Sequence, residues 1–205
     1  MGSELIEKYA FEAIDLIKKK EVSSSELLKA SQERHLEVDS HVNALPYTFY
    51  EKALIKAKSI NVDIEAQNNK SLLGLPIAVK DYNDVGGVPT TFGSKIFSNN
   101  IPLKSDSTIA RLEENGALPV AKSNVPEWAG GHTFNPVYGI TRNPFNKNKI
   151  AGGSSGGSSV ALATKQVWLA TGNDLGGSLR TPASFNNIVG LRPSIGVVPR
   201  GLRYN

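Results

Sequence analysis

Residues 152–159 consist only of glycine and serine, and this stretch restricts the possible fold more than any other part of the chain. Such composition is typical of flexible linkers between independent units. Here, however, an apolar run starts immediately at Val160 and predicts an apolar helix at about 157–165. A glycine-rich turn that enters a helix points backbone N–H groups at an anion or an oxyanion. The stretch is therefore either a linker or a binding turn.

A second glycine-containing segment, residues 173–182, contains the pair Gly176-Gly177 directly before Ser178. Two glycines let the backbone turn sharply and approach a substrate closely. A nucleophilic serine needs such a turn, because its hydroxyl must be presented and its own N–H must be free to join an oxyanion hole. The alternative is an ordinary turn with a capping serine.

A nucleophilic serine also needs a base. Two of the three histidines fall in the predicted front helices or their connection, which leaves His132, in an irregular stretch, as the histidine candidate. Lys80 is the other candidate, because it directly follows the apolar run 75–79, a predicted buried strand, and sites in α/β sheets form at the carboxyl ends of strands. Burial would lower its pKa toward neutrality. The alternative is a surface lysine paired with Asp81.

Helices and strands alternate along the chain. Ser23 and Glu26 form a capping-box pattern for one helix, and Ser105 or Asp106 would cap another. Periodicity predicts helices at about 4–20, 24–37, 49–60, 106–115 and 157–165, and strands at 72–79, 117–121 and 167–171. This alternation predicts an α/β fold with a mixed, mostly parallel β-sheet flanked by helices, in a single domain 1–205.

Composition excludes several classes of protein. Apolar residues make up 40% of the chain and charged residues 20%, which is typical of a globular domain. The net charge of +4 is spread out, and its densest run, 18–20, ends a predicted helix where cations complement the dipole, so we expect no nucleic-acid partner. The chain lacks cysteine, which excludes disulfides and thiolate catalysis. Residues 1–20 do not resemble a signal peptide and no apolar run could span a membrane, so we expect a cytoplasmic protein.

Six segments match, in the same order, the amidase signature family of Ser-cisSer-Lys amidohydrolases. They are GLPIAVKD at 74–81, TTFGS at 90–94, KSNVPE at 122–127, TRNPF at 141–145, GGSSGGS at 152–158 and DLGGSLRTPA at 174–183. The resemblance is strong over about 70–200 and weak over the front helices. It implies the amidase signature fold, with a helical front section 1–70 and a signature core 71–205.

The resemblance also implies a role for each matching position. Ser178 corresponds to the nucleophile, Ser154 to a proton-shuttling serine in a cis peptide bond, and Lys80 to the base. The N–H groups of Leu175, Gly176, Gly177 and Ser178 correspond to an oxyanion hole, and Ser155, Asp174 and Arg180 to supporting polar groups. We accordingly expect a small-molecule amide substrate, no metal and no organic cofactor, and a homodimer stays open.

Two features depart from the family pattern. Asn173 stands where members usually carry threonine or serine before the aspartate, and we expect a local effect only. Family members also continue well past this length, typically to more than twice it. We therefore expect the N-terminal part of a longer protein or a truncated product, incomplete at its C-terminus, with strand edges and apolar faces exposed.

Several functions stay open at this point. The leading hypothesis is an amidase. An amidotransferase A-type subunit for glutaminyl-tRNA formation usually carries EFAMG where this chain has EWAGG at 127–131, and the chain looks more like amidases of small or aryl amides. A truncated, non-catalytic fragment that binds a ligand or partner is a further hypothesis, although retention of Lys80, Ser154 and Ser178 favours chemistry. A phosphate-binding loop would end in Gly-Lys-Ser or Gly-Lys-Thr, and this one does not.

Overall fold

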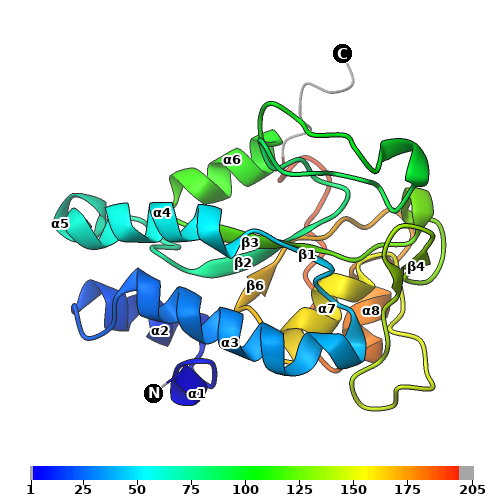
Figure 1. Ribbon diagram of the computed structural model, residues 1–205, viewed down its shortest axis with the longest axis horizontal. Coiled ribbons are helices and arrows are strands. Elements are labelled where there is room, and N and C mark those ends of the chain that lie inside the picture. Colours follow the sequence, from blue (N-terminus) through cyan, green and yellow to red (C-terminus); the bar gives the residue numbers. More distant parts are fainter. Residues whose placement is uncertain (1, 199–205) are drawn as a thin grey trace.

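A four-stranded sheet lies at the centre of the computed structural model, which describes residues 2–198 (Figure 1). The strand order is β1-β3-β2-β6, with bounds β1 Tyr47–Thr48, β2 Pro76–Lys80, β3 Leu118–Ser123 and β6 Leu169–Ala170. β1 runs antiparallel to β3, whereas β3, β2 and β6 are parallel to one another. A separate ribbon pairs β4 (Phe134–Asn135) with β5 (Gly139–Ile140). The predicted mixed, mostly parallel sheet is therefore confirmed.

Helices cover both faces of this sheet (Figure 1). Their bounds are α1 Gly2–Leu5, α2 Ala10–Lys18, α3 Ser24–Val42, α4 Tyr50–Val62, α5 Ile64–Gln67, α6 Ser107–Glu114, α7 Gly156–Ala163 and α8 Arg180–Phe185, with short 3₁₀ turns at Lys95–Phe97 and Glu127–Ala129. Ile109 of α6 packs on Ile77 and Val79 at one face of β2. α3 and α7 pack on the sheet in the larger core, which contains Ala78.

The front helices show where local sequence decides a boundary. Ser23 and Glu26 form the predicted capping box, with Ser23 N–H donating to the Glu26 carboxylate at 2.8 Å and Glu26 N–H donating to Ser23 Oγ at 3.2 Å. The single helix predicted at 4–20 is wrong, because two helices, α1 and α2, occupy this stretch. Tyr9 is extended and donates its N–H to the Glu12 carboxylate at 2.8 Å, so α2 starts anew after it.

Two other predicted boundaries also shift. The strand predicted at 72–79 begins only at Pro76, because residues 72–75 form a turn that bonds to the connection before β3, with Leu72 N–H donating to Asn115 O at 2.9 Å. α3 continues five residues past its predicted end, to Val42, where Asn43 closes it in the left-handed conformation. The helix predicted at 106–115 is confirmed as α6, and Asp106 occupies its N-cap position.

The fold gathers three chain segments at one edge of the sheet. β2 ends at Lys80, β6 ends at Ala170, and the two strands are parallel neighbours. Just past β6, Thr171 N–H donates to Ala78 O at 2.9 Å and keeps the following loop beside β2. α7 packs against both strands, and the glycine-serine stretch lies at its N-terminus, so the stretch is not a linker. The carboxyl ends of two parallel strands and one helix N-terminus thus meet, where sites form in α/β sheets.

Candidate active site

Lys80 is fully buried at the end of β2, which excludes the alternative of a surface lysine. Its amine donates to Ser154 Oγ at 2.7 Å and to Ser155 Oγ at 2.9 Å, and it also donates to Asn173 Oδ1. The backbone N–H of Lys80 donates to Thr171 Oγ1 at 3.0 Å. Within residues 2–198, no carboxylate forms an ion pair with this amine, and a buried amine among neutral oxygen atoms is a suitable proton acceptor.

Ser154 is held by a tightly packed turn. The Gly153–Ser154 peptide bond is cis, as the resemblance implies. A Cβ on Gly153 would come within 2.1 Å of Gly131 O, so glycine is required there. Thr133 fixes the turn from the same side, because its N–H and its Oγ1 both donate to Gly152 O, at 3.1 and 2.9 Å. This packing sets Ser154 against the Lys80 amine.

Asp174 organises the turn that presents Ser178. Its carboxylate accepts from the N–H of Gly177 at 2.8 Å and from that of Leu179 at 3.2 Å. Arg180 clamps the same carboxylate with two hydrogen bonds of 2.9 Å each. Ser155 N–H donates to Ser178 O at 3.1 Å, so the two glycine-rich segments lie side by side. The three predicted supporting residues therefore all bond in or to the turn that contains Ser178. Asp174 and Arg180 bond to each other within it, and Ser155 bonds to Ser178 itself.

Burial and charge set the protonation of this site. Burial lowers the pKa of Lys80 from 10.5 to about 7, and the negative charge of Asp174 opposes that shift. The Arg180 guanidinium, bonded to Asp174, holds the pKa of that carboxyl well below its usual range. Near neutral pH, Lys80 therefore exists as both ammonium and free amine, whereas Asp174 stays charged.

The predicted oxyanion donors differ in what surrounds them. Gly177 N–H is already engaged by Asp174. Leu175 is almost fully exposed and Gly176 is exposed. Within residues 2–198, no acceptor engages the N–H of Leu175, Gly176 or Ser178. Of the four predicted donors, these three N–H groups are therefore the ones without an acceptor in residues 2–198.

His132, the histidine candidate, lies on the surface next to Gly153, and the Lys80 amine contacts serine and asparagine oxygens, not its ring. Lys80, the other candidate base from the sequence, is the one that is buried against these serines. The contact between Lys80 and Asn173 was missed, although Lys80 directly follows one predicted strand and Asn173 lies two residues past the end of another. Thr133 was missed as well, and its place in an irregular stretch gave no indication of it.

The burial and pairing of a second lysine, Lys122, were also not predicted from the sequence. It is fully buried on β3, lies 3.5 Å from the Asp81 carboxylate and donates to Thr90 Oγ1 at 2.9 Å. Asp81 also accepts from the Thr91 backbone N–H at 3.1 Å. Asp81 is therefore paired with Lys122, not with Lys80.

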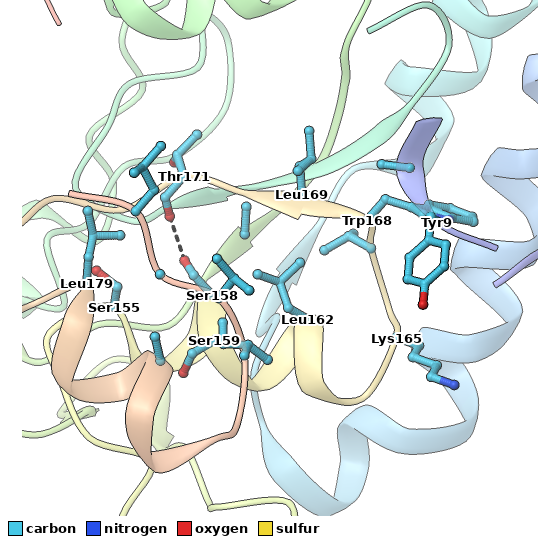
Figure 2. A pocket seen from close by; sticks show the side chains of 18 of the residues that line it. Tyr9, Ser155, Ser158, Ser159, Leu162, Lys165, Trp168, Leu169, Thr171 and Leu179 are labelled. Carbon is cyan, nitrogen blue, oxygen red and sulfur yellow. Dashed lines mark hydrogen bonds between the residues drawn. The ribbon is translucent and has the colours of Figure 1, made fainter. Parts of the chain in front are cut away.

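A cavity of about 780 Å³ lies behind the glycine-serine turn, between α7, β6 and the connection from α1 to α2 (Figure 2). Ser155 and Leu179 line the end nearest the turn, whereas Tyr9, Lys165 and Trp168 line the other end. Ser158 Oγ donates to Thr171 O at 2.7 Å on its wall. Lys80, Ser154 and Ser178 are not among the residues that line this cavity, whereas Ser155 and Thr171, which both bond to Lys80, do line it.

Comparison with known proteins agrees with this geometry. The sequence model of the family described as Amidase matches residues 26–202. The chain belongs to the amidase family. This membership confirms the resemblance drawn from the six sequence segments.

Solved structures and curated proteins are similar to this chain. A bacterial aryl acylamidase of the amidase signature family has a TM-score of 0.91 and 33% identity, covering 97% of this amidase-family chain and 42% of that one. The peptide amidase of Stenotrophomonas maltophilia has a TM-score of 0.88 and 26% identity, covering 95% and 42%. The A-type subunit of the glutamyl-tRNA(Gln) amidotransferase of Clostridium novyi is 39% identical over 199 residues, which are 96% of this chain and 41% of the relative.

The chain thus spans about two fifths of the length of the curated relatives it matches. Within residues 2–198, no helix has both the length and the apolar character needed to cross a membrane.

Proposed function

We propose that this chain carries the catalytic groups of an amidase that cleaves carboxylic amide C–N bonds through an acyl-enzyme on Ser178. The observation that carries the proposal is the buried Lys80 amine at 2.7 Å from Ser154 Oγ. Its pKa of about 7 supplies a free amine at neutral pH, and a base with a pKa near the working pH is the most effective.

In the proposed reaction, neutral Lys80 takes the proton of Ser154 while Ser154 takes that of Ser178. The Ser178 oxygen attacks the amide carbonyl carbon and forms a tetrahedral oxyanion. The N–H groups of Leu175, Gly176 and Ser178 stabilise that oxyanion, and one such donor contributes about 3 kcal/mol in comparable sites.

The proton then returns through Ser154 to the leaving nitrogen, and the C–N bond breaks to release the amine. Water attacks the acyl-enzyme, passing its proton along the same relay, and the carboxylic acid leaves while Ser178 regains its proton. Asp174 and Arg180 take no proton in this scheme. They support it by holding the turn that carries Ser178.

Labelling with a fluorophosphonate serine probe, followed by peptide mass mapping, tests this function. We expect the label on Ser178 in the wild type, and its loss in Ser178→Ala and in Lys80→Ala. Ser123→Ala is the matched control, because Ser123 is buried nearby but bonds to Ser158 at 2.6 Å. A folded wild-type chain, verified by thermal melting, that takes no label on Ser178 would refute the proposal.

A component of a glutamyl-tRNA(Gln) amidotransferase is the second candidate, because the curated relative from Clostridium novyi belongs to such an enzyme and is 39% identical. Two assays separate the candidates: release of 4-nitroaniline from an aryl amide, and release of ammonia from glutamine. Turnover of glutamine alone would favour the amidotransferase, whereas turnover of the aryl amide favours the amidase.

A further inference from the structure

The Lys80 amine has a third contact that lies outside the proposed Ser178–Ser154–Lys80 relay. Asn173 Oδ1 accepts a hydrogen bond from it. Asn173 follows β6 by three residues, and β6 is the parallel neighbour of β2, which Lys80 ends. Thr171 bonds to the backbone on both sides of Val79, accepting from Lys80 N–H and donating to Ala78 O, so the loop that carries Asn173 is fixed beside the lysine.

The three oxygens around the amine differ in what they can do. Each serine hydroxyl can donate or accept a hydrogen bond, whereas an amide oxygen can only accept. One N–H of Lys80 is therefore committed to Asn173 in both protonation states of the lysine. The ammonium form gives its two other hydrogens to Ser154 and Ser155. The neutral form has one other hydrogen and one lone pair, and only a serine hydroxyl can satisfy that lone pair.

We infer that Asn173 is a positioning residue, whose amide oxygen holds one N–H of Lys80 so that the lone pair of the neutral amine faces the serine hydroxyls. This inference rests on the proposed function. Because this amide oxygen can only accept, the lone pair of neutral Lys80 is left for the hydroxyl of Ser154 or Ser155.

The charged surroundings of Lys80 make this inference testable by pH. Asp174, from the same loop as Asn173, is the charged group that acts on the Lys80 amine, and it is paired with Arg180 at 2.9 Å and with Arg192 at 3.5 Å. Asp81 and Lys122 pair with each other. A change of charge at position 173 therefore acts on Lys80 at direct contact, without another ionised partner in between.

The experiment measures the rate of fluorophosphonate labelling of Ser178 from pH 5 to 10 in three variants. Asn173→Asp places a carboxylate against the amine, so we expect the acid limb of the profile to move up by about 1–3 pH units. Asn173→Leu removes the acceptor, so we expect the limb to move down and the alkaline plateau to fall about tenfold or more. Asn173→Thr, whose hydroxyl can still accept, should keep the limb near that of the wild type.

Asn148→Asp is the control, because it makes the same charge change at an exposed residue and should leave the profile unchanged. If wild-type Ser178 labels with an acid limb but folded Asn173→Asp and Asn173→Leu leave that limb in place, the inference about Asn173 is wrong and the proposed function stands. If wild-type Ser178 does not label at any pH, the proposed function is wrong, and the inference about Asn173, which rests on it, is wrong as well.

Discussion

Lys80 and Lys122 are fully buried lysines on neighbouring parallel strands, one register position apart, since Lys80 pairs with Ser123 and Lys122 with Val79. Burial lowers the pKa of both amines, to about 7 for Lys80 and about 8 for Lys122. Their contacts differ in kind. Lys80 contacts two serine hydroxyls and an amide oxygen, whereas Lys122 lies beside the carboxylate of Asp81. The first environment is suited to proton transfer and the second to holding an ion pair.

Labelling of Ser178 should rise with pH across the neutral range. Only the neutral form of Lys80 can accept a proton, and with a pKa of about 7 the neutral fraction increases as pH rises. We expect the labelling rate to increase about tenfold from pH 6 to pH 8 and to level off above about pH 9. Stopped labelling assays at fixed probe concentration measure this. A flat profile from pH 6 to 9 would count against Lys80 as the base.

Removal of the Ser154 hydroxyl should slow labelling of Ser178 with little change in folding. Ser154 is the relay between Lys80 and Ser178 in the proposed reaction, and loss of a positioned proton-transfer group lowers rates by about 10²–10⁴-fold. Ser154→Ala is compared with Ser155→Ala, which removes the other hydroxyl that contacts Lys80, at 2.9 Å. Equal losses in the two variants would show that Ser154 has no special role as the relay.

The sequence predicted those parts of the fold that depend on local chemistry. The Ser23–Glu26 capping box and the buried run that ends at Lys80 are both present, because each depends on residues close together in the chain. The break at Tyr9 was not predictable from apolar periodicity, since a Glu12 carboxylate bonded to a tyrosine N–H starts α2. The two-residue strands β1 and β6 depend on pairing with distant strands, and only β6 was anticipated, within a longer run.

The same distinction between local signals and distant contacts applies to the candidate site. Short motifs predicted Lys80, Ser154 and Ser178 as site residues, because the family resemblance rests on short segments of the chain. The Lys80–Asn173 contact and the Lys122–Asp81 pair each join residues from different segments, which the parallel pairing of β2 with β3 and β6 places side by side. A side chain's partner across a sheet is set by register, which a single sequence does not state.

Loss of Lys122 should destabilise the fold by leaving Asp81 buried without its counter-charge. Burial raises the pKa of Asp81, and the positive charge of Lys122 opposes that shift. Breaking a buried pair by removing one partner costs about 3–5 kcal/mol. We expect Lys122→Met to lose about that much free energy of unfolding at pH 7 in urea denaturation. Adding Asp81→Asn should recover part of the loss, and a double variant no more stable than Lys122→Met would contradict the ion-pair explanation.

The packing of α7 gives the last prediction. Gly157 lies in its first turn, and a Cβ there would come within 2.2 Å of Asn124 N and 2.7 Å of Ala44 O. Both are backbone atoms of buried segments, so neither can move aside as a flexible side chain can. Overpacking of this kind costs about 1–3 kcal/mol and can cost more.

Gly157→Ala should therefore lower the free energy of unfolding by about 3 kcal/mol, measured by urea denaturation. Gly130→Ala is the matched control, because Gly130 is exposed and its nearest neighbour to an added Cβ lies 3.5 Å away. That control should stay within about 0.5 kcal/mol of the wild type. The two variants together separate the effect of losing a glycine from the effect of crowding, because both add the same methyl group. Equal stability of the two variants would mean that α7 does not pack this closely against Asn124 and Ala44.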